Sequence, residues 1–303
     1  MIASLKKEKS VLFGIAGHGV EVVLPDTFDW VRLLPAFQPF RCDSSMGNET
    51  ICSIRITETP IDIEQDATTV RYDVYGLLGH WFCLMETDQN YIVEIQYVEN
   101  GSHYRMITDK TFSTGTAYID GKDANADVIL SLFLMIIFGQ SAVLHQTILI
   151  HASVVEKDGQ GYVFLGKSGM GKSTHSQLWL RHIEGTELLN DDNPAIRLEK
   201  DGSVNIYGTP WSGKTPCYKN RKVRLKALVR LEQASANRFI WKEGVDALIT
   251  LLPSCLSMRW NTFLYTEMCN LLETVIGKVK VGYLECLPDK EAALLCNYEI
   301  NIL

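Results

Sequence analysis

The sequence lacks the paired cysteines that mark a disulfide framework or a structural metal site. Its eight cysteines are scattered along the chain, and no two of them form a C-x-x-C pair. We therefore expect reduced, mostly buried thiols in a reducing compartment. The same spacing argues against a zinc site.

Long hydrophobic runs and an excess of basic residues are also missing. The most apolar run, residues 128–138, is shorter than the about 20 residues that a membrane-spanning helix needs, so we expect a buried helix there. Residues 11–16, which follow the first lysines, are typical of a strand rather than of a signal peptide. A net charge of −7 argues against broad binding to nucleic acids or anionic membranes. These absences predict a cytoplasmic protein that binds neither nucleic acid nor membrane.

The composition is that of an ordinary globular protein, with 46% hydrophobic and 21% charged residues in a chain of 303. The first 120 residues contain short apolar or alternating runs, which predict an antiparallel sheet. The runs are residues 20–24, 52–56, 69–75, 81–85 and 91–97. They hold no catalytic constellation, so we interpret residues 1–120 as a lid, docking or oligomerisation module, and residues 121–303 as a second domain.

The second domain mixes predicted helices and strands. A long apolar helix covers residue 125 to about residue 146, and a strand follows at residues 147–150. In the last third we expect helical segments, a strand at residues 278–284, and a final helix capped by Asp289. The predicted fold class is therefore α/β (α+β overall): a core of mixed sheet with flanking helices, preceded by the β-rich module.

The most informative segment is residues 166–174, which read GKSGMGKST and match the phosphate-binding pattern G-x4-G-K-S/T. An apolar run precedes it and a helical pattern follows, which is the strand–loop–helix context that this motif requires. Glycines allow consecutive N–H groups to face a phosphate, and the helix N-terminus adds partial positive charge. The residues predicted to bind a nucleotide are Gly166, Ser168, Gly169, Met170, Gly171, Lys172, Ser173 and Thr174. Within this set, Lys172 is placed to reach the outer phosphates and Ser173 to hold Mg²⁺.

Two neighbouring carboxylates and a histidine complete the predicted chemistry. Asp191 and Asp192 follow a predicted strand at residues 186–189, one helix after the phosphate loop. At the carboxyl end of such a strand, one carboxylate can hold Mg²⁺ and another can accept the proton of an attacking hydroxyl. His151 follows the strand before the loop, where an imidazole can bind a metal or orient a carboxylate.

Three segments in this order resemble the P-loop superfamily of HPr kinase/phosphorylase and phosphoenolpyruvate carboxykinase. They are His151-Ala152-Ser153, the loop at residues 166–174, and the sequence LLNDD at residues 188–192. Carboxykinases carry His-Cys-Ser-Ala-Asn, Gly-Leu-Ser-Gly-Thr-Gly-Lys-Thr and Gly-Asp-Asp; HPr kinases carry His-Gly, Gly-x-Ser-Gly-x-Gly-Lys-Ser and Ala-Asp-Asp. The resemblance implies a P-loop kinase-like core in which Asp192 contacts the metal, Asp191 is the general base or an indirect partner, and His151 lies in the active site.

The chain also departs from both families. No lysine lies between Lys122 and Lys157, where carboxykinases carry a metal-binding lysine, and this disfavours decarboxylation. The substrate-capturing loop of HPr kinases, with its catalytic arginine, has no clear counterpart. Residues 208–214 and the basic residues after them either take an analogous place or form a solvated basic face. The substrate-binding candidates are Trp211, Ser212, Gly213, Lys214 and Arg221.

These observations predict a phosphotransferase that uses Mg²⁺ and ATP to phosphorylate a hydroxyl on a small molecule, peptide or protein. The catalytic candidates are Asp191, Asp192, His151 and Lys172, with Ser173 and Asp192 as metal ligands. One alternative is a non-catalytic nucleotide sensor in which ATP changes how the β-rich module docks on a partner. A weaker alternative is a minimal carboxykinase. The sequence leaves open the acceptor, the choice among ATP, GTP and pyrophosphate as donor, and whether the chain forms a homo-oligomer.

Overall fold

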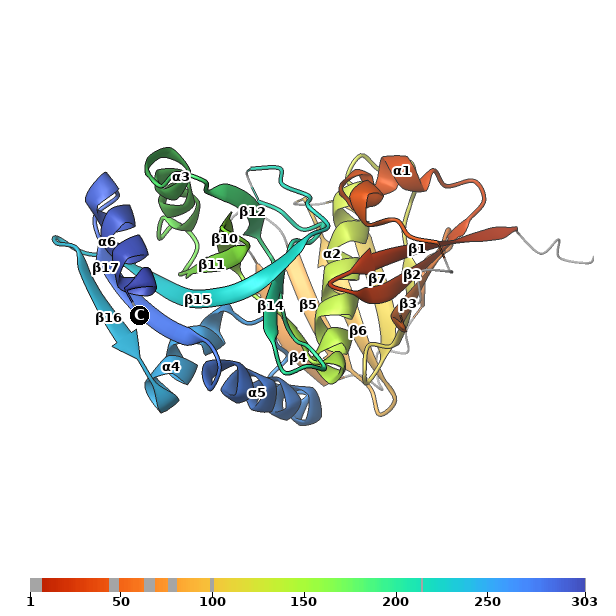
Figure 1. Cartoon of the computed structure of the whole chain (residues 1–303). Helices are drawn as coiled ribbons and strands as arrows, with labels where there is room; N and C mark the ends of the chain where they lie inside the picture. The colour runs from red at the N-terminus through yellow and green to blue at the C-terminus, as the bar shows by residue number, and fades with distance from the viewer. Residues whose placement is uncertain are drawn as a thin grey trace, which may run out of the picture. The chain divides into compact units, whose positions relative to one another are not determined.

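The computed structural model describes residues 7–43, 49–62, 69–75, 81–98, 101–213 and 215–302. The chain divides into two compact units, Met1–Ala142 with Arg259–Thr262, and Val143–Met258 with Phe263–Leu303. Each unit contains one mixed sheet with helices beside it, so the chain is α/β (Figure 1). The division falls after Ala142, later than the expected boundary at residue 120, because helix α2 (Ala126–Ser141) packs against strands of the first sheet.

The first sheet has eight strands in the order β1-β2-β3-β8-β7-β6-β5-β4. The pairs β2/β3 and β3/β8 are parallel and the others are antiparallel, so the expectation of a wholly antiparallel sheet was wrong. The segment between β2 and β3 crosses over through the short helices α1 (Trp30–Leu33) and η1 (Pro35–Phe40). The strands are β1 (Glu8–Ile15), β2 (His18–Pro25), β3 (Thr50–Thr57), β4 (Thr69–Tyr75), β5 (Trp81–Glu86), β6 (Asn90–Gln96), β7 (His103–Asp109) and β8 (Thr114–Tyr118).

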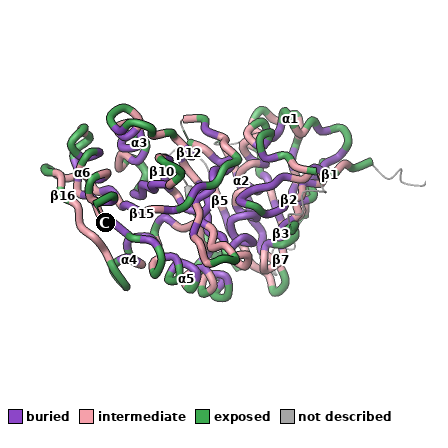
Figure 2. Tube along the Cα trace, in the orientation of Figure 1, coloured by how far each residue is buried: buried purple, intermediate pink, exposed green. Residues whose placement is uncertain are grey.

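Helix α2 forms the apolar centre of the first unit. It continues as a 3-10 turn, so that Ala126–His145 is 20 residues long and is apolar enough to cross a membrane by length and composition. The expectation that this run is too short to span was therefore wrong. However, 67% of the helical window is buried inside the structure, and Phe133 and Ile137 are fully buried. Figure 2 colours the whole trace by burial. Such burial is typical of a core helix.

The second sheet has helices on both of its faces. Its path is β12-β10-β11-β15-β14-β13-β9, with β17 beside β15 and β16 beside β17. Helices α3 and α6 lie on one side of the sheet and α4 and α5 on the other (Figure 1). On β11, Tyr162 and Phe164 pack with α3 and α6, whereas Val163 and Leu165 pack with α4 and α5. The strands are β9 (Thr147–Leu149), β10 (Ala152–Lys157), β11 (Gln160–Leu165), β12 (Glu187–Asp192), β13 (Ala195–Leu198), β14 (Val204–Tyr207), β15 (Lys222–Gln233), β16 (Arg238–Lys242) and β17 (Lys280–Cys286). The helices are η4 (Ala142–His145), α3 (Lys172–His182), α4 (Gly244–Leu251), η5 (Leu252–Ser254), α5 (Thr262–Ile276) and α6 (Lys290–Asn301).

Two local predictions are confirmed. Asp289 caps α6, because its Oδ1 accepts a hydrogen bond from the backbone N–H of Ala292 at 2.9 Å. The eight cysteines all carry free thiols, and most of them are buried.

Candidate functional site

The phosphate loop, His151 and the two carboxylates lie at one edge of the second sheet. Strand β11 leads into the loop, and Asp191 and Asp192 are the last two residues of β12. Strand β10 lies between them and is antiparallel to both, with Ala152 opposite Leu165 on one side and Asp192 on the other. Because β10 begins at this edge, His151 immediately before it is there as well. The topology therefore brings together the three segments that the sequence singled out.

The loop backbone depends on two of its glycines. Gly169 and Gly171 have φ angles of +82° and +94°, which side chains strongly disfavour. A Cβ at either position would meet no atom within 4 Å, so the requirement is conformational rather than steric. Gly171 is the N-cap of α3, and its carbonyl oxygen accepts a bond from the N–H of His175 at 2.8 Å. The loop thereby places the positive end of an 11-residue helix at this edge.

Lys172 is folded back onto the loop. Its Nζ donates to the carbonyl oxygens of Gly166 at 3.1 Å and Lys167 at 3.4 Å, and the residue is only 9% exposed. Burial lowers the pKa of Lys172, while the negative charges of Asp192 and Asp191 oppose that shift. The ammonium group of Lys172 is thus poorly solvated and makes only weak hydrogen bonds to neutral carbonyls. The oxygens of a bound anion would be stronger partners for it, so anion binding is favoured.

The two carboxylates have different partners. Asp191 is 5% exposed, and its Oδ1 accepts a hydrogen bond from Ser173 Oγ at 3.0 Å. Asp192 is more open; its Oδ1 lies 3.4 Å from His151 Nε2, and its Oδ2 accepts from Asn193 Nδ2 at 2.8 Å. The structure therefore pairs the loop serine with Asp191, whereas the predicted metal ligands were Ser173 and Asp192.

The electrostatics of the His151–Asp192 pair favour a basic carboxylate. Burial raises the pKa of Asp192, the charge of Asp191 adds to the shift, and the positive charges of His151 and Lys172 oppose it. Burial and the charge of Lys172 lower the pKa of His151, while Asp192 opposes this. The environment therefore shifts the imidazole toward its neutral form and makes the Asp192 carboxylate more basic. Such a carboxylate has a higher affinity for a proton than a carboxylate in water.

Ser173 and Asp191 are donors of the kind that Mg²⁺ prefers. Mg²⁺ in nucleotide sites takes few protein oxygens and completes its shell with phosphates and water. A hydroxyl and a carboxylate oxygen 3.0 Å apart, at the start of a helix that follows a phosphate loop, fit that donor set. In the part of the chain that the structure describes, no group of three or more His, Cys, Asp or Glu side chains could hold a metal ion.

Residues 208–213 pass beside the carboxylates. Ser212 forms a bridge with Asp192, and the N–H of Gly213 donates to the carbonyl of Asp191 at 2.8 Å. A Cβ on Gly213 would lie 2.8 Å from that carbonyl, so only glycine approaches this closely. Ser212 and Gly213 are thus at the predicted site, whereas Trp211 is 6% exposed and belongs to the core. Lys214 lies outside the described residues.

Asn190 holds this segment in place. It is fully buried, its Nδ2 donates to the carbonyls of Thr209 at 3.3 Å and Trp211 at 3.2 Å, and its Oδ1 accepts from the N–H of Asp192 at 3.1 Å. We expect Asn190→Ala to lower the free energy of unfolding by about 2 to 3 kcal/mol, because it leaves buried polar groups without their partner. Urea denaturation measures this loss. Asn270→Ala, on the exposed face of α5, is the matched control and should change stability by less than about 0.5 kcal/mol. Equal effects of the two substitutions would contradict the role of Asn190.

Arg221 is not brought to this edge. Its guanidinium contacts Glu156 and lies 3.5 Å from Glu187 Oε2. Glu187, the partner of Arg221, is the first residue of β12, and Asp192 is the last. The two ends of this strand are about 16 Å apart, so Arg221 lies far from the site. Lys219 also pairs with Glu187, at 3.1 Å. These basic residues belong to a set of surface ion pairs at the opposite end of the strands, and the prediction of a substrate contact for Arg221 is not supported.

Another arginine, which was not predicted from the sequence, does lie near the loop. Arg230 stands opposite Leu165 in the parallel pairing of β15 with β11, directly before the loop begins. Its Nη1 donates to the carbonyl of Thr250 at 3.2 Å, and its positive charge contributes to the lowered pKa of Lys172. The first residues of β15 alternate between charged and apolar side chains, which indicates a strand. We did not recognise this pattern as a strand, and Arg230 lies further along it.

A cavity of about 400 Å³ opens beside the loop. Gly171 and His175 line it from the start of α3, Leu231 from the end of β15, and Cys286 from the end of β17. The parallel strands β11, β15 and β17 all end at this edge. The carboxyl ends of parallel strands are where open α/β sheets bind ligands.

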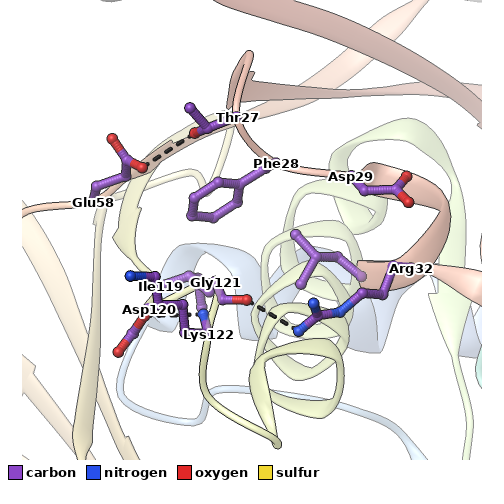
Figure 3. A pocket seen from close by; sticks show the side chains of 10 residues that line it. Thr27, Phe28, Asp29, Arg32, Glu58, Ile119, Asp120, Gly121 and Lys122 are labelled. Carbon is purple, nitrogen blue, oxygen red and sulfur yellow. Dashed lines mark hydrogen bonds between the residues drawn. The ribbon is translucent and has the colours of Figure 1, made fainter.

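A second cavity, of about 510 Å³, lies in the first unit (Figure 3). Its walls include Phe28, and Arg32 Nη2 donates to the carbonyl of Gly121 at 3.1 Å across one side. Opposite, Thr27 Oγ1 donates to Glu58 Oε1 at 3.1 Å. None of the residues that line this cavity is among the predicted site residues.

Comparison with known proteins gives little direct guidance. No protein-family model matches the chain, and no curated protein matches it. Among solved structures the chain is similar to the Hpr(Ser) kinase/phosphatase from Coxiella burnetii, with 13% identity and a TM-score of 0.31, over 51% of this chain and 92% of that chain. A likeness at this level carries no inference about activity. We therefore derive the function from the geometry of the site.

Proposed function

We propose that the protein transfers the terminal phosphoryl group of a nucleoside triphosphate to a hydroxyl group, with Mg²⁺ as cofactor. The observation that carries the proposal is the bond of 3.0 Å between Ser173 of the phosphate loop and Asp191, with a second, more exposed carboxylate, Asp192, beside it. Asp191 is thus hydrogen-bonded to the serine beside which the metal would bind, while Asp192 is open to a substrate. The order of the three motifs, which resembles HPr kinases, supports the same proposal.

Each residue then has a distinct task. Lys172 and the loop N–H groups bind the outer phosphates, and the positive charge of Arg230 adds to the potential there. Ser173 and Asp191 would hold Mg²⁺, which supplies positive charge to the phosphate oxygens when bound. This assignment exchanges the roles that the resemblance implied for Asp191 and Asp192.

Asp192 would accept the proton of the acceptor hydroxyl. As that oxygen forms its bond to the terminal phosphorus, the bond between the phosphorus and the leaving diphosphate oxygen breaks, and the proton goes to the carboxylate. His151 lies 3.4 Å from the same carboxylate and orients it. The acceptor hydroxyl would belong to a small molecule, a peptide or a protein and would reach the site from the open side of Asp192.

The test is transfer of label from γ-labelled MgATP to a panel of hydroxyl compounds and serine-containing peptides, with calorimetric titration of ATP in parallel. We expect Mg²⁺-dependent binding and a labelled acceptor. Binding without transfer to any acceptor, together with a nucleotide-dependent change in oligomeric state, would favour the non-catalytic sensor instead. Absence of Mg²⁺-dependent binding would refute both functions.

A further inference from the structure

The cavity beside the loop has the size and the apolar lining that suit the binding of a ring. Leu178, Leu231 and Leu287 supply apolar wall, and the volume of about 400 Å³ lies within the range of small-molecule sites. Gly169 and Gly171 form part of the phosphate loop and also line the cavity. A ligand whose phosphates occupy the loop can therefore extend directly into this space.

One wall of the cavity carries a polar side chain whose state is set by its surroundings. His175 is only 3% exposed, and its ring stands edge-on to Phe164 with centroids 4.6 Å apart. The indole Nε1–H of Trp179 donates to His175 Nε2 at 3.1 Å. Because an indole nitrogen is only a donor, Nε2 must be the unprotonated nitrogen of the ring. Burial lowers the pKa of His175 to about 4, so the ring is neutral and its proton is on Nδ1.

The Nδ1–H group is thus a fixed donor on a buried residue of the cavity wall. Among the described residues, the His175 side chain makes one hydrogen bond, which Nε2 accepts from Trp179. His175 lines the cavity, so a ligand bound there is placed to supply an acceptor for this donor. Every nucleobase carries ring-nitrogen or carbonyl acceptors.

We propose that this cavity binds the base of the nucleoside triphosphate donor, and that His175 Nδ1–H donates a hydrogen bond to an acceptor atom of that base. The inference rests on the proposed function, because the phosphate loop fixes where the ligand begins. It gives the base of the proposed donor a binding site of its own, which an inorganic polyphosphate would not fill. An inorganic donor would leave the apolar walls of the cavity uncovered.

The first test compares binding of MgATP with binding of magnesium tripolyphosphate by calorimetry. We expect wild-type protein to bind MgATP at least about tenfold more tightly, because only ATP buries a base. Ala234→Phe fills the cavity and should remove that difference, whereas Ala236→Phe, on the same turn but outside the lining, should preserve it. Equal affinity of wild-type protein for the two ligands, or an unchanged preference in Ala234→Phe, would overturn the inference. If neither ligand binds wild-type protein, the proposed function itself fails.

The second test isolates the donor on His175. The double substitution His175→Phe with Trp179→Phe removes the donor without leaving the indole N–H unpaired, and Trp179→Phe alone is the control. We expect the double variant to bind MgATP about five- to tenfold more weakly than the control, with tripolyphosphate affinity unchanged. His175→Gln, whose amide can both accept from Trp179 and donate into the cavity, should recover most of the loss. Equal MgATP affinity in the double variant and its control would contradict the assigned hydrogen bond.

Discussion

Asp192→Asn is expected to lower kcat for phosphoryl transfer about a thousandfold while leaving the affinity for MgATP within about threefold of wild type. Asparagine has the shape of aspartate but does not accept a proton at neutral pH. Neither Lys172, which would bind the phosphates, nor Ser173, which would hold Mg²⁺, makes a hydrogen bond to the Asp192 side chain. The loss should therefore appear in turnover and not in binding. Steady-state transfer of label from γ-labelled ATP and calorimetric titration measure the two quantities separately.

The pH dependence and a neighbouring substitution serve as controls for this prediction. Burial raises the pKa of Asp192 above its ordinary value of 3.8, so kcat of the wild type should fall as pH drops through that raised pKa, where the base becomes protonated. The Asn variant should lack this limb. Asp191→Asn should instead raise the Mg²⁺ concentration needed for binding, since Asp191 is the partner of Ser173. If Asp192→Asn weakens Mg²⁺-dependent binding as much as it slows turnover, the metal lies at Asp192, as the resemblance implied.

Much of the fold is predictable because local signals agree with it. Four of the five runs noted in the first 120 residues lie within strands β2 to β5, and the fifth, residues 91–97, extends one residue past the end of β6. The helix after Asn125 and the cap at Asp289 are where the patterns place them. Strand β8 was missed because its sequence, TGTAY, contains a glycine and buries only Ala117. Its pairing with β3 and β7 is a long-range property that a local pattern does not contain.

Strand β15 was missed for a different reason. Its first residues alternate, with Lys222 and Arg224 exposed and Val223 and Leu225 buried, which is the pattern of a half-buried strand. We interpreted the charges as a basic cluster with a possible substrate role. The strand is in fact the centre of the sheet and pairs with β11, β14 and β17. The same error placed Arg221 near the substrate and overlooked Arg230.

The members of the candidate site were predictable, but their pairing was not. Adjacent residues of a strand point to opposite faces, so one of the two aspartates had to face α3. Which one it is depends on the register between β10 and β12. Ser153 lies opposite Asp191, and its hydroxyl is 2.6 Å from the hydroxyl of Ser176 on α3. Asp191 therefore shares the face of α3 and meets Ser173 there.

Lys172→Met is expected to weaken MgATP binding at least a hundredfold and, in the absence of ligand, to raise the melting temperature by about 2 to 4 °C. The first effect follows from loss of the charge that meets the outer phosphates. The second follows because burial lowers the pKa of Lys172, which means that folding disfavours its charged form. A methionine fills similar space without a charge to desolvate.

The stability gained by Lys172→Met should depend on pH, because it comes from removal of a buried charge. The unfavourable contribution of Lys172 to stability is fully present below its folded-state pKa, where the group is charged in both the folded and the unfolded chain. It vanishes as pH rises through that pKa toward the ordinary value of 10.5. The advantage of the Met variant should therefore shrink in alkaline buffer, as thermal melts at neutral and alkaline pH would show. Lys167→Met, an exposed residue of the same loop, is the control and should change neither the melting temperature nor MgATP affinity by much. A lower melting temperature for Lys172→Met would contradict this prediction. It would mean that the two hydrogen bonds from Nζ to the loop carbonyls stabilise the ligand-free protein by more than burial of the charge destabilises it.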